Sequence, residues 1–140
     1  MEFMGINYMA VLAAGIAGYA FGAVYYMLLG KAWLKAQDKT EADIKGPNGE
    51  MDYKPFIIAA VAALFMAFML AGVMGHLGET GFSLRGGLIS GVFMWSGFVL
   101  TTTLVNHAYQ GQKLSLTAID LGHWLGVLLI QGAIIGLIGV

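Results

Sequence analysis

Residues 118–140 read AIDLGHWLGVLLIQGAIIGLIGV, and this stretch decides the fold. A helix needs about 20 predominantly apolar residues to cross the hydrocarbon core of a bilayer, and this stretch supplies them. A helix is the expected structure because an open strand would leave backbone N–H and C=O groups unpaired in lipid. Asp120 and His123 nevertheless stand inside the stretch, and Asn106 and His107 precede it by a few residues.

The composition of the whole chain agrees with a membrane protein. Of 140 residues, 59% are hydrophobic and only 11% are charged. A soluble domain of this size could not bury so much apolar surface, because small domains bury only part of their surface. The net charge of -1 gives no reason to expect nucleic acid as a partner. Because the chain has no cysteine, disulfides and thiolate metal sites are excluded.

Four apolar runs of spanning length follow one another along the chain. They cover about residues 6–29, 55–75, 84–105 and 118–140. The first run is too long for the core of a signal peptide and follows Glu2 instead of a basic segment, so we expect it to be retained. The sequence therefore predicts an all-α integral membrane bundle of four transmembrane helices, with residues 1–140 as a single domain and a polar loop at about residues 30–54.

The placement of basic residues predicts how the bundle is oriented. Arg85 is the single basic residue on one side of the predicted bundle. The loops on the other side carry six: Lys31, Lys35, Lys39, Lys45, Lys54 and Lys113. Because loops rich in lysine and arginine stay in the cytoplasm, we expect both termini to face away from it.

Glycines recur at helical spacing in the first and fourth runs. Gly15, Gly18 and Gly22 share one face of the first predicted helix. Small residues at such spacing let membrane helices approach closely, either within one bundle or between copies of the chain, and we favour packing within the bundle. The fourth run carries two similar pairs, Gly122 with Gly126 and Gly132 with Gly136.

Polar side chains are predicted to gather at the cytoplasmic boundary. The first and third helices end there and the fourth begins there. Asp120 and His123 share one face, because they are three residues apart. The predicted cluster consists of Tyr25, Tyr26, Asn106, His107, Asp120 and His123.

Two interpretations of this cluster stay open. In the structural one, TAID at residues 117–120 forms a capping box, with Thr117 as the cap of the fourth helix. In the functional one, ionisable groups inside a membrane mark a path or a site, so that the cluster binds a polar ligand or relays protons. Two histidines could hold a metal or haem, but no motif fixes such a site. We therefore predict no metal site and name no cofactor and no catalytic residue.

Residues 6–36 and 94–139 resemble a family of small bacterial membrane proteins catalogued as domain of unknown function seventeen sixty-one (DUF1761). The resemblance rests on Asn7, Gly22, Tyr26, Gly30, Lys31 and Trp33 near the start, and on Gly97, Phe98, Gly111, Asp120, Gly122, Trp124, Gly132 and Gly136 near the end. It implies a four-helix, multi-pass protein of the bacterial inner membrane. It implies no activity, substrate or catalytic residue.

Three classes of function remain, and a binding, accessory or structural membrane subunit comes first. The alternative is a small oligomeric transporter or channel for a polar solute or proton. A membrane enzyme or redox protein is the least favoured. A pore would need polar residues along its length, but the second run has none at mid-depth and the third offers little beyond Ser96. The expected partners are the lipid bilayer and either a second copy of the chain or another membrane protein.

Overall fold

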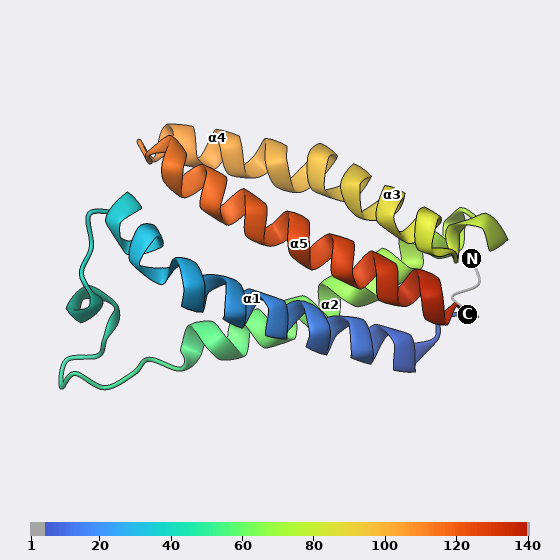
Figure 1. Ribbon diagram of the computed structural model, residues 1–140, viewed down its shortest axis with the longest axis horizontal. Coiled ribbons are helices and arrows are strands. Elements are labelled where there is room, and N and C mark those ends of the chain that lie inside the picture. Colours follow the sequence, from blue (N-terminus) through green and yellow to red (C-terminus); the bar gives the residue numbers. More distant parts are fainter. Residues whose placement is uncertain (1–4, 140) are drawn as a thin grey trace.

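The structure is a computed structural model that describes residues 5–139, and this part of the chain folds into four long helices (Figure 1). The third is continuous from Leu84 to Tyr109 but changes its winding in the middle. The elements are α1 (Tyr8–Ala36), η1 (Glu41–Ile44), α2 (Lys54–His76), η2 (Glu79–Gly81), α3 (Leu84–Met94), the π-helical segment η3 (Trp95–Leu100), α4 (Thr101–Tyr109) and α5 (Leu114–Ile138). The prediction of an all-α bundle of four membrane-spanning helices is confirmed.

Local sequence explains where several helices begin. The side chain of Asn7 caps α1 by accepting hydrogen bonds from the backbone N–H groups of Met9 and Ala10. Ser83 caps α3 in the same way. Pro55 stands in the first turn of α2, where its missing N–H costs nothing.

The helices are longer than the apolar runs predicted. Helix α1 continues to Ala36 instead of ending near residue 29, α4 reaches Tyr109 instead of 105, and α5 begins at Leu114 instead of 118. The predicted loop at 30–54 is therefore shortened to residues 37–53. The reason is physical: hydropathy marks where a helix leaves the hydrocarbon, whereas lysine, glutamine and alanine continue a helix readily in a polar environment.

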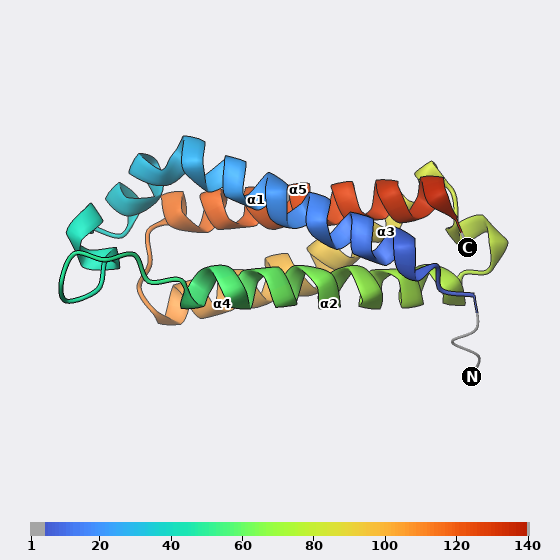
Figure 2. The ribbon, with the colours of Figure 1, turned by 90° about the horizontal axis from the view of Figure 1, so that it is seen from below.

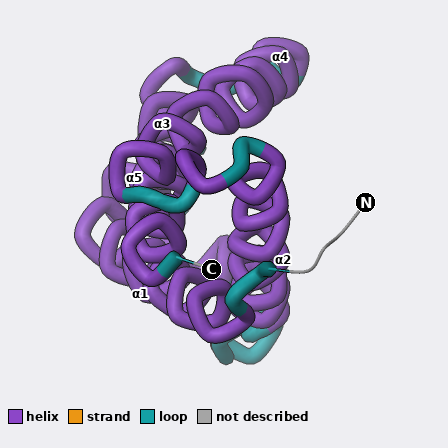
Figure 3. The backbone as a smooth tube through the Cα atoms, turned by 90° about the vertical axis from the view of Figure 1, so that its right-hand side faces the viewer, coloured by secondary structure: helices purple, strands orange, loops and turns teal. Residues whose placement is uncertain are grey.

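Helix α5 is the centre of the bundle. It packs along α1 on one side and along α3 on the other, and α2 packs mainly on α1 (Figures 1 and 3). In the most apolar 18-residue stretch of α5, 44% of the residues are buried. In the corresponding stretch of the Leu84–Tyr109 helix, only 11% are buried. Figure 2 shows α1 and α5 in one layer, with α2 and α4 below them. The most apolar helix of the C-terminal region thus forms the core of the membrane domain.

Close backbone contacts hold α5 against α3. Gly87 and Gly132 face each other so closely that a Cβ on either would overlap the carbonyl group of the other. A Cβ on Gly91 would lie 2.8 Å from the carbonyl oxygen of Leu128. Gly136 approaches the backbone of Ser83 in the same way. Such contacts are a common means of helix association in membranes, where dispersion forces replace the hydrophobic effect.

The glycines of α1 also lie at helix contacts. Gly15 faces α2, where a Cβ would lie 2.5 Å from a methyl carbon of Leu64. Gly18 and Gly22 face α5, and a Cβ on Gly22 would lie 2.6 Å from Nε2 of His123. In return, Gly122 and Gly126 of α5 make room for Tyr25 and Phe21. The structure therefore places the glycine faces of α1 and α5 at contacts within one chain.

Two hydroxyl groups bond to carbonyls of the π-helical segment. The hydroxyl of Thr101 donates to the carbonyl of Gly97 at 2.8 Å, and that of Thr102 donates to the carbonyl of Phe98. The hydroxyl groups thereby find acceptors within their own helix, since lipid offers them none.

The two polar connections lie at one end of the bundle, and the start of α1 and the end of α5 lie at the other (Figure 1). Residues 37–53 join α1 to α2, and residues 110–113 turn from α4 into α5. Nζ of Lys113 and Oδ1 of Asp38 form an ion pair of 2.7 Å that ties the two connections together.

Gly132→Ala is expected to destabilise the bundle by about 1–3 kcal/mol, because the new methyl group forces the backbones of α5 and α3 apart. The measurement is thermal unfolding in detergent, followed by circular dichroism. The matched control is Gly72→Ala in α2, where a Cβ meets no atom within 4 Å. This control should leave stability unchanged or raise it slightly, because alanine favours helix over glycine. Equal melting temperatures for the two variants would contradict the contact.

Candidate functional site

Four polar side chains meet at the loop end of the bundle and form what we call the Asp120 cluster: Tyr26, His107, Thr117 and Asp120. The hydroxyl of Tyr26 donates to Oδ1 of Asp120 at 2.7 Å. Nε2 of His107 lies 3.8 Å from Oδ2 of the same carboxylate, and Nδ1 of His107 lies 2.9 Å from the hydroxyl of Thr117. The cluster thus connects α1, α4 and α5 through one carboxylate.

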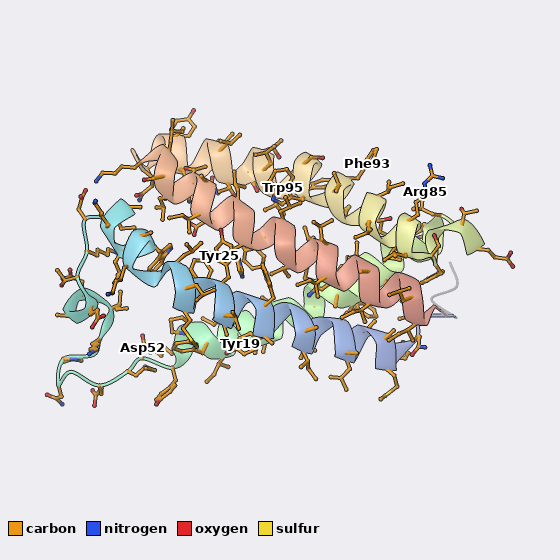
Figure 4. The ribbon with its side chains drawn as sticks, viewed as in Figure 1. Tyr19, Tyr25, Asp52, Arg85, Phe93 and Trp95 are labelled. Carbon is orange, nitrogen blue, oxygen red and sulfur yellow. The ribbon has the colours of Figure 1, made fainter. Side chains whose placement is uncertain are left out.

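Tyr25 supports this connection from the next position along α1. Its hydroxyl donates to the backbone carbonyl of Ile119 at 2.7 Å, directly before the carboxylate in sequence. The absence of a side chain at Gly122 leaves room for this hydroxyl, which lies 2.7 Å from where a Cβ would be. Figure 4 shows Tyr25 between α1 and α5.

The capping box predicted at residues 117–120 is absent. Because α5 begins at Leu114, Thr117 is its fourth residue and Asp120 its seventh. The cap position belongs to Lys113, whose side chain makes no capping bond. Thr117 instead bonds His107, and Asp120 is held by Tyr26. The carboxylate is therefore bound by side chains from other helices and not by the start of its own.

His123 lies one turn further into α5 and is separate from the Asp120 cluster in its hydrogen bonding. Its side chain is buried, and its Nδ1 has no hydrogen-bond partner among residues 5–139. Aromatic rings surround it instead: the ring centres of Tyr26 and Trp124 lie 4.8 Å and 4.5 Å away. Phe21 stacks on it at 6.4 Å. The structure places His123 beside Tyr25 and Tyr26 through ring packing and not through the hydrogen bonds that were predicted for it.

Asn106 does not join the cluster. Its side chain is exposed, and no hydrogen bond from it to any described residue is present. Its neighbour His107 faces α5, where it contacts Thr117. Asn106 points elsewhere because successive residues of a helix differ by about 100° in direction.

Two further side chains donate between helices within the span. Nε1 of Trp95 donates to the carbonyl of Leu121 at 2.9 Å, and Figure 4 shows Trp95 between α3 and α5. Nε2 of Gln131, which is fully buried, donates to the carbonyl of Ala63 on α2 at 2.9 Å. Trp95 was not predicted from the sequence. The available signal was an indole N–H at mid-span, which needs an acceptor when it is buried.

The chemistry open to the Asp120 cluster is hydrogen bonding and proton exchange at a partly accessible carboxylate. The side chains of Asp120 and His107 are 22% and 17% exposed, so the described chain does not enclose them completely. No group of three histidine or acidic side chains positioned for a metal is present among the described residues. The arrangement fits a clasp between helices and a site for protons or a polar ligand.

Tyr26→Phe is expected to lower stability by about 1 kcal/mol, because it removes the hydrogen bond to Asp120. Tyr19→Phe is the matched control, because Tyr19 lies on the same helix and its hydroxyl makes no hydrogen bond with the described residues. A double-mutant cycle with Asp120→Asn, measured by thermal unfolding in detergent, isolates the pair. A coupling energy near zero would show that Tyr26 and Asp120 do not interact.

Comparison with known proteins gives one match. No curated protein and no solved structure matches the chain. A family model described as "Protein of unknown function (DUF1761)" matches residues 9–136, which include the Asp120 cluster and nearly all of the four spans. The resemblance seen in the sequence is thereby confirmed, and the chain belongs to the DUF1761 family.

Proposed function

We propose that this chain is a binding, accessory or structural subunit of a bacterial inner membrane, where it assembles with a second copy or another membrane protein. The proposal rests on one observation: several polar side chains of the spans form hydrogen bonds that join one helix to another. Tyr26 and Asp120 join α1 to α5, and His107 and Thr117 join α4 to α5. Two further bonds, from Trp95 and Gln131, join η3 and α2 to α5.

A second candidate function is transport of a proton or a small polar solute. The observation that favours it is the partial exposure of Asp120 and His107, since ionisable groups inside membranes often mark such paths. Against it stands helix α2, which carries no polar side chain from Pro55 to Gly75. A transport path through one chain would therefore receive no hydrogen-bonding side chain from this part of α2.

Asp120→Asn and His123→Ala distinguish the two functions. For a subunit, both variants should lower the melting temperature in detergent, and proteoliposomes containing the natural protein should show no proton flux above protein-free vesicles. The flux is measured with a pH-sensitive dye inside the vesicles. Glu79→Gln is the control, because Glu79 is exposed at the other end of the bundle. Proton flux that Asp120→Asn abolishes at unchanged stability would overturn the subunit proposal and support transport.

The proposed orientation has both termini outside the cytoplasm. A reporter enzyme fused after the C-terminus should be active if it needs the periplasm and inactive if it needs the cytoplasm. The physical reason is the excess of lysines at the end of the bundle that holds residues 37–53 and 110–113. A fusion within residues 46–50 should give the reverse pattern and serves as the internal control. Cytoplasmic activity of the C-terminal fusion would refute the orientation.

A further inference from the structure

One face of α1 packs against no other part of the described chain. Val24, Met27 and Leu28 lie on this face and are 53%, 79% and 77% exposed. Lys31 and Lys35 continue the same face toward the helix end, because residues three and four apart in a helix are neighbours. The face is therefore an apolar stripe that ends in two positive charges.

The length of α1 places the two lysines at the level of lipid headgroups. Helix α1 has 29 residues, or about 43 Å, whereas the hydrocarbon core is about 30 Å thick. Its apolar part, residues 8–29, already covers about 33 Å, so the last turns, which carry the lysines, extend beyond the hydrocarbon. Trp33 lies in these turns and packs edge-on against Tyr26 of the same helix, with 5.9 Å between ring centres. An aromatic ring at this position is typical of the boundary between hydrocarbon and headgroups.

Lys31 and Lys35 have no acidic partner within the described residues. The ion pairs present between residues 5 and 139 are Lys113 with Asp38 and His107 with Asp120. Lys39 and Lys45 differ, because they share the connection 37–53 with several acids. For example, the Thr40 backbone N–H and hydroxyl, and to a smaller extent Lys39, hold the pKa of the Asp43 carboxyl below its usual value.

We propose that this face of α1 is a binding site for a phospholipid with an anionic headgroup. The phosphate lies between the ammonium groups of Lys31 and Lys35, and an acyl chain lies along Leu28, Met27 and Val24. This site is separate from the Asp120 cluster and does not depend on the role of that cluster.

Charge decides between a lipid and a second copy of the chain as the occupant. In a two-fold dimer with parallel helices, the same face of both copies would meet, and four lysine ammonium groups would come together. Like charges placed opposite each other in an interface are costly. An anionic lipid instead neutralises the lysines, and such an attraction of lysine to an anionic membrane surface is favourable.

The test is native mass spectrometry of the purified full chain titrated with phosphatidylglycerol or phosphatidylcholine. The natural protein should retain phosphatidylglycerol about 30-fold more tightly than phosphatidylcholine, since two lysines contribute to the difference. In the variant Lys31→Gln/Lys35→Gln, the ratio of the affinities for phosphatidylglycerol and phosphatidylcholine should fall close to one. The variant Lys31→Arg/Lys35→Arg should keep the preference, because the charge is preserved. Exposed positions at a helix end tolerate all these substitutions, and circular dichroism verifies the fold.

The matched control is Lys39→Gln/Lys45→Gln, which removes the same charge from the acid-rich connection. It should leave the preference unchanged. An equal loss in this control would show that only net charge matters and would overturn the site. A natural protein without preference, or an undiminished preference in Lys31→Gln/Lys35→Gln, would also overturn it. Glycerol phosphate should not displace the lipid, and displacement at equal concentration would mean that an anion alone is bound, without the apolar stripe.

Discussion

The close approach of α5 to α3 is the constraint on which the rest of the structure depends. Membrane helices gain little from burying apolar side chains against each other, because lipid is equally apolar. Association must come from contact between surfaces that fit, and backbone against backbone at Gly87 and Gly132 is the closest fit available. Once α5 is fixed there, its opposite face receives α1, and α1 in turn carries α2. The position of every span can be traced to this contact.

The two ends of this helix pair are stabilised by different chemistry. Toward the termini, glycine contacts such as Gly136 with Ser83 hold α3 and α5 together. Toward the loops, α4 has no buried residue, and polar bonds replace apolar packing. His107 and Thr117 bring α4 to α5, and the same imidazole faces the carboxylate that Tyr26 binds from α1. A charged group near the membrane boundary is tolerated because it has partners from two helices.

Much of this arrangement could be predicted from the sequence, for identifiable reasons. Spans follow from hydropathy, because the bilayer imposes a minimum apolar length. The glycine positions at contacts follow from their spacing, as Gly18 and Gly22 illustrate. The convergence of Tyr26, His107 and Asp120 follows from counting spans, which places all three at one boundary.

The start of α5 could not be predicted, because LSLT at residues 114–117 has no strong helix signal before the apolar run. The outward direction of Asn106 also could not be predicted, because it depends on the winding of the helix before it.

That winding has a geometric consequence for the third span. In an uninterrupted α-helix, residues sixteen apart, such as Gly91 and His107, would point about 160° away from each other at roughly 100° per residue. Both nevertheless face α5. The π-helical segment Trp95–Leu100 holds an additional residue within its turn, which turns the following helix back by roughly the angle of one residue. The segment therefore changes the direction of the residues that follow it, so that one continuous span turns Gly91 toward α5 at one depth and His107 toward the same helix at another.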